Sequence, residues 1–250
     1  MKTLVYTTAV DVEKRGVKDT SIHNITKLSW QHWCERHKSD FHVIDQPTID
    51  GATPHWFRYS IFDLCPDYDR YLYVDADIMA KWDAGNVFEE CPDANKLYAT
   101  QDTSYLSWVV DEIKQYQPIF NQKYSWEDYF NSGVLLFGSK HKDLFNSFVK
   151  FFKENKKELT KTEKRVGSFR TSGFDQTPFN FFIRNSDVEF DFLPERFNLA
   201  HLIQRGVMDG MQFTDLADFW HFHSITRNLQ LEIVTQVWEN LKENYNLSCK

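Results

Sequence analysis

The sequence predicts an α/β fold in a single domain, with a mostly parallel sheet flanked by helices. Short β-branched or aromatic runs alternate with stretches of helical length, an order that is typical of parallel strands joined by right-handed crossovers. The 250 residues contain no repeat and no Pro-, Ser- or Gly-rich linker, which favours one domain with a large core. Aromatic residues make up 16% of the chain and are spread along it, which argues against disorder.

Composition also limits the partners and the compartment. The net charge of −7 argues against nucleic acid or an anionic membrane as the main partner. The cysteines are scattered without paired spacing, which argues against a disulfide framework or a zinc site and favours a reducing compartment. The apolar N-terminal run is too short for a usual signal peptide, and no later run could span a bilayer. We therefore expect a cytoplasmic protein, and the sequence leaves its oligomeric state open.

The first part of the chain alternates between predicted strands and helices. Residues 3–10 form a short β-branched strand. It contains Thr7-Thr8-Ala9, small residues of the kind found where a first strand approaches a nucleotide, although an ordinary strand end is the alternative. A helix is expected over 22–38, because apolar side chains recur on one face at helical spacing. A strand at 41–45 follows, and then a helix over 54–64 with Pro54 in its first turn.

The next strand, 71–74, ends in Asp75-Ala76-Asp77. Two carboxylates at the tip of a buried strand are unfavourable unless a metal, a cation or several donors meet them. The carboxyl end of a strand is also where ligands bind in an open α/β sheet. We therefore interpret the pair as ligands of a divalent ion that holds a diphosphate. The spacing alone proves little, because a second pair, Asp67 and Asp69, follows Pro66 in a turn-like stretch.

The second part of the chain contains further strands and helices. Residues 102–130 are rich in aromatic and polar side chains; core packing explains most aromatic residues in most proteins, and a partly irregular flap over a site is the functional interpretation. Strands are expected at 97–101, 134–137, 188–193 and 219–223, helices at 142–155, 175–182 and 229–244, a solvated helix end at 153–164 and a mobile loop at 167–173.

Several motifs then occur in one order along the chain. Arg58 precedes Tyr-Val-Asp-Ala-Asp at 73–77, and Asn-Ser-Gly-Val at 131–134, Asp-Gln at 175–176, Leu-Pro-x-x-Phe-Asn at 193–198 and His-Phe at 221–222 follow. This order resembles the nucleotide-sugar-dependent glycosyltransferases of the GT-A fold, most closely family eight, the glycogenin and lipopolysaccharide-galactosyltransferase group. The resemblance extends from Leu4 to about Arg227. It implies a Rossmann-like domain with a nucleotide-binding part at about 1–100 and an acceptor-side part at about 101–250.

The resemblance implies a metal site. Asp75, Asp77 and His221 are similar to the family's ligands of a Mn²⁺ or Mg²⁺ ion that bridges the donor diphosphate. A site rich in oxygen with one imidazole suits Mn²⁺. His223 is the rival ligand, because on a strand it would lie on the same face as His221; we favour His221 because the family's histidine is followed by an aromatic residue.

The resemblance also implies roles near the transferred sugar. Arg58 is similar to an arginine that reaches the donor sugar and phosphates, with a surface helix charge as the alternative. Asn131 is similar to a residue near the transferred sugar, and Gly133 permits a close backbone approach. Asp175 and Gln176 match a pair beside the anomeric carbon and hydroxyls, although Asp175 could also cap its helix.

The rest of the implied donor site is Thr7, Thr8, Ala9, Ala76 and Arg227. Arg227 stands where the family commonly has a lysine that meets the diphosphate. The chain departs from the family pattern where Ser224 replaces a glycine, where a Pro-Trp pair is absent and where Phe197 replaces a tryptophan.

The predicted function is metal-dependent transfer of a sugar from a nucleotide-sugar donor, UDP-linked by default, to a hydroxyl of a glycan acceptor. The resemblance implies retention of anomeric configuration. An inverting enzyme would need a carboxylate base, for which Asp102 and Asp128 are candidates. A sugar-phosphate nucleotidylyltransferase is disfavoured because residues 7–18 lack a Gly-rich loop with a basic residue. A glycan-binding relative without activity is disfavoured by the intact Asp75, Asp77 and His221.

Overall fold

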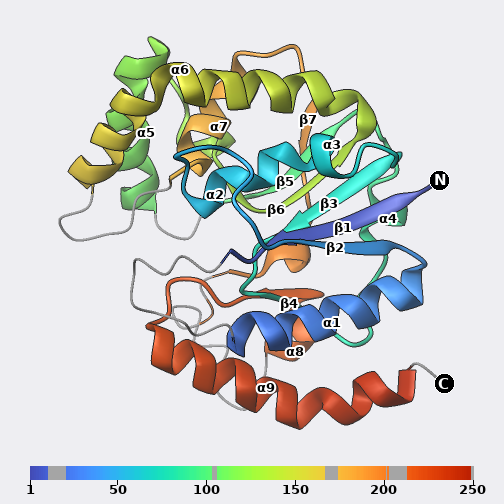
Figure 1. Cartoon of the computed structure of the whole chain (residues 1–250). Helices are drawn as coiled ribbons and strands as arrows, with labels where there is room; N and C mark the ends of the chain where they lie inside the picture. The colour runs from blue at the N-terminus through green and yellow to red at the C-terminus, as the bar shows by residue number, and fades with distance from the viewer. Residues whose placement is uncertain (11–20, 103–105, 167–173, 201, 203–212, 249–250) are drawn as a thin grey trace.

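The computed structural model describes residues 1–10, 21–102, 106–166, 174–200, 202 and 213–248. Its centre is a six-stranded sheet with helices on both faces (Figure 1), in the order β2-β1-β3-β6-β5-β7. The strands of this sheet are β1 (Thr3–Thr8), β2 (Asp40–Ile44), β3 (Arg70–Val74), β5 (Leu97–Gln101), β6 (Phe130–Gly138) and β7 (Phe190–Phe192). A smaller sheet pairs β4 (Ile78–Ala80) with β8 (Phe219–His221).

The sheet is mostly parallel, as predicted. β1 is parallel to β2 and β3, and β5 is parallel to β7. β6 runs antiparallel to both of its neighbours, β3 and β5. Because of this reversal, the first residues of β6 lie beside the last residues of β3, and the Asp75 N–H donates to the Gly133 carbonyl at 2.8 Å. The Asn-Ser-Gly motif is thereby placed next to the Asp-Ala-Asp motif.

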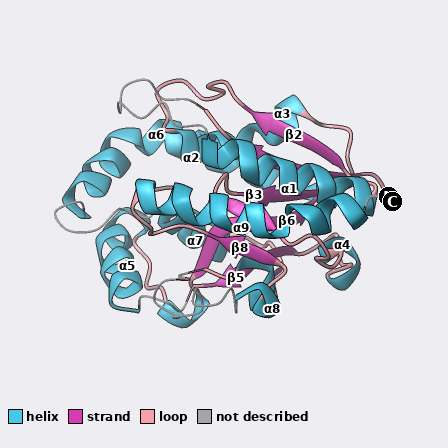
Figure 2. Ribbon diagram, turned by 90° about the horizontal axis from the view of Figure 1, so that it is seen from below, coloured by secondary structure: helices cyan, strands magenta, loops and turns pink. Residues whose placement is uncertain are grey.

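The helices form two layers. α1 (Ser21–His37) and α9 (Arg227–Ser248) pack against each other and cover one face, which Figure 2 shows from below. The other layer contains α2 (Pro54–Phe57), α3 (Ile61–Leu64), α5 (Leu106–Phe120), α6 (Lys142–Val166) and α7 (Gln176–Arg184) (Figure 1). The remaining short helices are α4 (Val87–Glu90) and α8 (Phe213–Leu216). Among the described helices, none is both long enough and apolar enough to cross a membrane.

The helix predicted over 54–64 is broken into shorter pieces. A 3₁₀ turn at Arg58–Ser60 separates α2 from α3. The Ser60 hydroxyl donates to the Phe57 carbonyl at 2.7 Å, a local bond that competes with the regular helical pattern. The break matters for function, because it lies where the chain presents Arg58.

The flap predicted over 102–130 is wrong for most of its length. Residues 106–120 form the regular helix α5, whose Val109, Ile113 and Tyr116 are buried on one face. Tyr129 is also fully buried, so core packing explains most aromatic residues of this segment. Trp108 does line the pocket described below. Residues 103–105 lie outside the described part of the chain.

Several element ends differ from the sequence prediction. β6 begins at Phe130, four residues before the predicted 134, because Asn131 still pairs with Thr100 of β5. α6 continues to Val166, since Phe152 and Leu159 keep an apolar face buried through the charged segment. β8 ends at His221, two residues before the predicted 223. The loop predicted at 167–173 lies outside the described residues.

Aromatic side chains fill the core between the sheet and the helix layer that contains α2, α3, α5, α6 and α7. Trp56, Tyr59 and Phe148 contact one another with ring centroids 4.8 to 6.1 Å apart. The Tyr71 and Phe137 rings stack across β3 and β6 at 5.4 Å. Each buried ring removes a large apolar area from water, so this layer is a main source of the stability of the fold. The described cysteines, Cys34, Cys65 and Cys91, are free thiols.

Candidate active site

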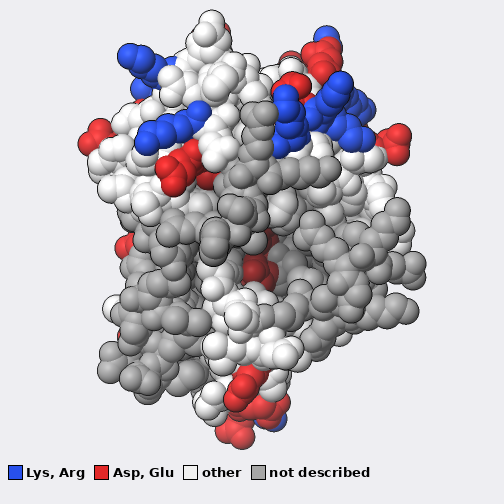
Figure 3. Space-filling model, turned by 90° about the vertical axis from the view of Figure 1, so that its left-hand side faces the viewer, with Lys and Arg blue, Asp and Glu red and all other residues white. Residues whose placement is uncertain are grey.

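A cavity of about 910 Å³ lies at the carboxyl ends of β1 and β3, where a ligand is expected in a sheet of this kind. Figure 3 shows that this face of the molecule is hollowed near its centre, with acidic side chains inside the hollow. The acidic residues that line the cavity are Asp75, Asp77, Asp102 and Asp175.

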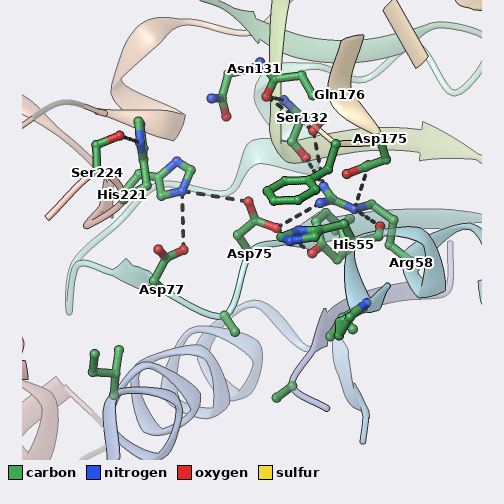
Figure 4. A pocket seen from close by; sticks show the side chains of 18 of the residues that line it. His55, Arg58, Asp75, Asp77, Asn131, Ser132, Asp175, Gln176, His221 and Ser224 are labelled. Atoms are coloured by element: carbon green, nitrogen blue, oxygen red, sulfur yellow. Dashed lines mark hydrogen bonds and ion pairs between the residues drawn. The ribbon is translucent and has the colours of Figure 1, made fainter. Parts of the chain in front are cut away.

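Asp75, Asp77 and His221 come together on one side of this cavity (Figure 4). The ladder between β4 and β8 pairs Ile78 with His221, which brings the imidazole beside the two carboxylates. His221 Nε2 lies 3.4 Å from Asp77 Oδ1 and 3.8 Å from Asp75 Oδ2. One ligand atom from each residue falls within 4.8 Å of the others. Two carboxylates and one imidazole are ligands that suit Mn²⁺ or Mg²⁺, so the residues present fit a divalent ion.

Other side chains hold these three groups in place. His221 Nδ1 lies 2.9 Å from Asn198 Oδ1, so a proton on Nδ1 leaves Nε2 facing the carboxylates. The Tyr73 hydroxyl donates to Asp75 Oδ1 at 2.6 Å, and Gln230 Nε2 donates to Asp77 Oδ2 at 3.1 Å. Each carboxylate therefore has one oxygen held by a donor and the other oxygen turned toward His221.

Charge interactions affect the Asp77 carboxyl. Burial alone would raise the pKa of Asp77, but attraction to His221 in its protonated form outweighs burial and holds this pKa well below its ordinary value. Asp77 is therefore ionised at neutral pH and is ready to bind a cation.

His223, the rival ligand, lies outside this cluster. β8 ends at His221, so the alternation of a strand does not continue to His223. The two imidazole rings meet edge to face with centroids 4.3 Å apart, and His223 Nδ1 lies 2.7 Å from the Ser224 hydroxyl. The geometry therefore favours His221 as the ligand. Ser224 has φ of 61°, in the left-handed region, a conformation that glycine adopts more easily than other residues.

Arg58 is buried, with 2% of its side chain exposed, and is not the surface helix charge considered as an alternative. Its Nε donates to the His55 carbonyl at 2.9 Å, and its Nη1 donates to the Ser132 carbonyl at 2.5 Å. Nη2 lies 3.3 Å from Asp75 Oδ1, and Nε lies 3.3 Å from Asp175 Oδ2. Burial by itself lowers the pKa of Arg58, but the nearby Asp175, Tyr73 and Asp75 raise it overall. Arg58 therefore stays charged and links Asp75, one of the candidate metal ligands, to Asp175.

Asp175 lies on the opposite side of Arg58 from Asp75 and is also 2% exposed. Its Oδ2 accepts a hydrogen bond from the Tyr59 hydroxyl at 2.6 Å. It precedes α7 but makes no side-chain cap bond, so the helix-cap interpretation is wrong. Burial raises the pKa of Asp175 above its ordinary value, although Arg58 acts in the opposite direction.

Gln176, Asn131 and Asp102 form a polar cluster on the same wall of the cavity. Gln176 Oε1 accepts from the Ser132 N–H at 3.0 Å, and Gln176 Nε2 donates to Asp102 Oδ2 at 3.2 Å. Asn131 Nδ2 donates to the same Asp102 oxygen at 3.4 Å. Asp128, the other base considered for an inverting reaction, does not line the cavity and forms an ion pair with Arg184 at 3.3 Å.

The remaining predicted donor-site residues fall into three groups. Thr8, Ala9 and Ala76 line the cavity, and the Ala76 carbonyl accepts from the Thr26 hydroxyl at 2.7 Å. Thr7 is buried in β1 and does not line the cavity. Arg227 is the first residue of α9, and the position of its side chain lies outside the described part of the chain.

Some residues of the site were missed by the sequence analysis. Asn198 ends the Leu-Pro-x-x-Phe-Asn motif at 193–198, but no role was assigned to it. Its place in that motif was the signal that could have identified it. Tyr73 likewise begins the Tyr-Val-Asp-Ala-Asp motif without a role having been assigned to it, whereas Tyr59 and Gln230 had no comparable signal, because each contacts the site through the folded structure alone.

The position of His221 leaves no room for a side chain on residue 133, which is Gly133. A Cβ atom on residue 133 would lie 2.5 Å from His221 Cε1 and 2.8 Å from Asn131 Oδ1. We expect Gly133→Ala to displace the imidazole and to lower Mn²⁺ affinity by about tenfold or more in calorimetric titration. Gly85→Ala is the control, because its Cβ would meet only the flexible end of Glu90. Equal Mn²⁺ affinity in the two variants would contradict the metal site.

Comparison with known proteins identifies the chain. The sequence model of glycosyl transferase family 8 matches residues 6–227. The chain belongs to glycosyl transferase family 8. It is therefore a glycosyltransferase, as the order of motifs predicted, and the nucleotidylyltransferase alternative is excluded. A search of the curated proteins finds no match to this sequence.

Solved structures show the same fold at low sequence identity. A glycosyltransferase involved in glycosylation of the major capsid of PBCV-1 is 12% identical, with a TM-score of 0.61 over 94% of this family 8 chain and 100% of that one. The bifunctional glycosyltransferase WbbM is 14% identical, with a TM-score of 0.58, and this chain covers 51% of its length. An active-site mutant of LgtC is 15% identical, with a TM-score of 0.52 over 95% of each chain. These likenesses confirm the GT-A fold.

Proposed function

We propose that this family 8 glycosyltransferase transfers a hexose or pentose from a UDP-sugar to a hydroxyl of a glycan acceptor, with Mn²⁺ or Mg²⁺ as its cofactor. The observation that carries the proposal is the cluster of Asp75, Asp77 and His221 inside a cavity of about 910 Å³. When bound by these residues, a divalent ion supplies positive charge to the diphosphate leaving group.

Other residues around Asp75, Asp77 and His221 have separate proposed roles. Arg58 balances the charges of Asp75 and Asp175 and so holds both carboxylates in fixed positions. In the proposal, Thr8, Ala9, Ala76 and Arg227 contact the nucleotide and its phosphates. Most of the residues proposed to contact the nucleotide-sugar therefore lie in the nucleotide-binding part at about 1–100.

Asn131, Asp175 and Gln176 are proposed to lie beside the transferred sugar. The negative charge of Asp175 and the amide dipole of Gln176 would stabilise positive charge that develops at the anomeric centre. We propose retention of configuration, which the resemblance to family 8 implies. Inversion is the second candidate, because Asp102 also lines the cavity and could accept the proton of an acceptor hydroxyl.

A thermal-shift series with UDP, GDP and ADP, each with and without Mn²⁺, tests the donor site. We expect UDP with Mn²⁺ to raise the Tm by about 5 to 10 °C at a concentration about 100 times its Kd, and UDP alone to have little effect. Stabilisation by GDP in place of UDP would contradict the UDP assignment. Failure of every nucleoside diphosphate to act with Mn²⁺ would contradict the whole donor site.

The same preparation can then be assayed for hydrolysis of a panel of nucleotide sugars and for transfer to glycan acceptors. The anomeric configuration of the product, read by NMR, decides between the two stereochemical candidates. A β-linked product from an α-linked donor would overturn retention and leave Asp102 as the candidate base.

A further inference from the structure

A buried carboxylate on α5 has no part in the chemistry described above. Glu112 is completely buried, and a buried carboxylate destabilises a fold unless donors meet it. The Thr177 hydroxyl donates to Glu112 Oε2 at 2.7 Å, across the contact between α5 and α7, which lie side by side in Figure 1. Thr177 directly follows Gln176, so Glu112 is one hydrogen bond away from a neighbour of the proposed active-site amide.

A continuous hydrogen-bond chain runs from Glu112 to Gln176. The Thr177 hydroxyl lies 2.7 Å from the Tyr129 hydroxyl, and Gln176 Nε2 donates to that Tyr129 oxygen at 3.3 Å. Thr177 and Tyr129 are both fully buried, so bulk water does not compete for these bonds.

The carboxylate gives this chain a direction. The Thr177 hydroxyl is the donor to Glu112 Oε2, as an ionised carboxylate requires, so the Thr177 proton points toward Glu112. The Thr177 oxygen can then accept from Tyr129, and the Tyr129 oxygen can accept from Gln176. Burial, together with the charge of Glu112, raises the pKa of Tyr129 well above its ordinary value, so Tyr129 keeps the proton that it donates.

The other contacts of Gln176 agree with this direction. The Ser132 N–H can only donate, so the atom 3.0 Å from it is the amide oxygen. The amide nitrogen has two protons, and its acceptors are Asp102 Oδ2 at 3.2 Å and the Tyr129 hydroxyl. If Tyr129 could not accept, one amide proton would remain buried without a partner, and the amide would lose a restraint on its rotation.

We propose that Glu112 is a positioning residue that orders the Thr177 and Tyr129 hydroxyls and thereby fixes the Gln176 amide in the cavity. The positioning stands on the hydrogen-bond chain alone, whereas its effect on turnover rests on the proposed function of Gln176. The chain also links α5, which carries Trp108 on the cavity wall, to the start of α7.

Variants that interrupt the chain at each step test the proposal. Glu112→Gln allows an amide N–H to face Thr177 and so reverses the order, Thr177→Val removes one hydroxyl, and Tyr129→Phe removes the other. Thr177→Ser keeps the hydroxyl and should therefore keep the turnover of the unchanged protein. Tyr124→Phe is the matched control, because the Tyr124 hydroxyl bonds the Asp128 carbonyl and Asn180 Oδ1 and, among the described residues, makes no hydrogen bond to Thr177, Tyr129 or the Gln176 side chain.

In donor hydrolysis we expect the three interrupting variants to lower kcat by about five- to tenfold, the effect of one misplaced hydrogen bond. The KM for the donor and the Mn²⁺-dependent stabilisation by UDP should stay within about twofold of the unchanged protein, since uniform binding is untouched. Thr177→Ser and Tyr124→Phe should retain full turnover. An equal loss of kcat in Tyr124→Phe would indicate general loosening and overturn the proposal.

A second measurement needs no substrate. In ¹⁵N-edited NMR spectra, the side-chain amide signals of Gln176 are assigned by their loss in Gln176→Glu. We expect these signals to move or broaden in Glu112→Gln, Thr177→Val and Tyr129→Phe, and to remain in place in Thr177→Ser and Tyr124→Phe. Unchanged signals in the first three variants would overturn the positioning even if UDP binds with Mn²⁺. Failure of UDP to bind, with the expected NMR changes, would instead reject only the proposed donor chemistry.

Discussion

Asp77→Asn is expected to abolish metal-dependent binding of UDP and to lower donor turnover on the order of a thousandfold. Asn keeps the shape of Asp77 and can still present an oxygen to Gln230, which donates to Asp77 Oδ2 at 3.1 Å. The group turned toward His221 would then be a neutral NH₂, which cannot bind a cation. Isothermal titration of Mn²⁺ and UDP, together with hydrolysis assays, measures both effects.

The second Asp-x-Asp pair provides the control. Asp67 is exposed in the loop before β3, so Asp67→Asn should leave Mn²⁺ affinity and turnover unchanged. Removal of the metal from the unchanged protein with EDTA should reproduce the loss seen in Asp77→Asn, and added Mn²⁺ should restore only the unchanged protein. Metal-dependent UDP binding that survives in Asp77→Asn would move the metal site elsewhere.

Asp75 and Asp77 could be inferred as candidate metal ligands from their position after a predicted strand, whereas His221 came from the resemblance to family 8. Asp75 and Asp77 follow an apolar run that is typical of a buried strand. His221 was expected in the middle of a strand at 219–223, but the structure ends β8 at this residue. The groups that hold them could not be predicted in the same way. Asn198 reaches His221 across 23 residues, and Gln230 reaches Asp77 across 153. A side-chain bond between such distant positions leaves no periodic pattern in the sequence.

The same reasoning explains which parts of the fold were predicted. Strands and helices that alternate at the start of the chain contain their own period, and they were placed within a few residues. α5 was missed because its aromatic content was given more weight than the helical spacing of Val109, Ile113 and Tyr116. The reversed direction of β6 has no local cause, because it is set by its pairing with β3 and β5.

Arg58 shows most clearly what could not be predicted from the sequence, since a charged residue on a helix is usually exposed. Its burial places a cation between two carboxylates, and its removal should therefore have a large effect. We expect Arg58→Met to lower the free energy of unfolding by about 3 to 5 kcal/mol, because Asp75 and Asp175 lose their partner while Asp175 stays buried. Urea denaturation measures this loss. Arg184→Met, which breaks an exposed ion pair with Asp128, should cost less than about 1 kcal/mol.

The pH dependence of the Arg58→Met defect identifies its cause. Burial already raises the pKa of Asp175 in the fold, and Arg58 opposes that rise, so its removal raises this pKa further. A carboxyl with a raised pKa in the fold binds more protons folded than unfolded, so stability falls as pH rises toward the folded pKa. The deficit of Arg58→Met should therefore be larger at pH 8 than at pH 5.5.

A double-mutant cycle separates the lost charge pair from lost packing. Asp175→Asn still accepts from Tyr59 but has no charge, so Arg58→Met combined with Asp175→Asn should be more stable than the sum of the single losses by about 1 kcal/mol or more. Additive losses, with a deficit that is the same at pH 8 and pH 5.5, would mean that Arg58 stabilises the fold through its packing and its bonds to the His55 and Ser132 carbonyls. In that case the charge balance that positions Asp75 for the metal would have to come from another group of the cavity.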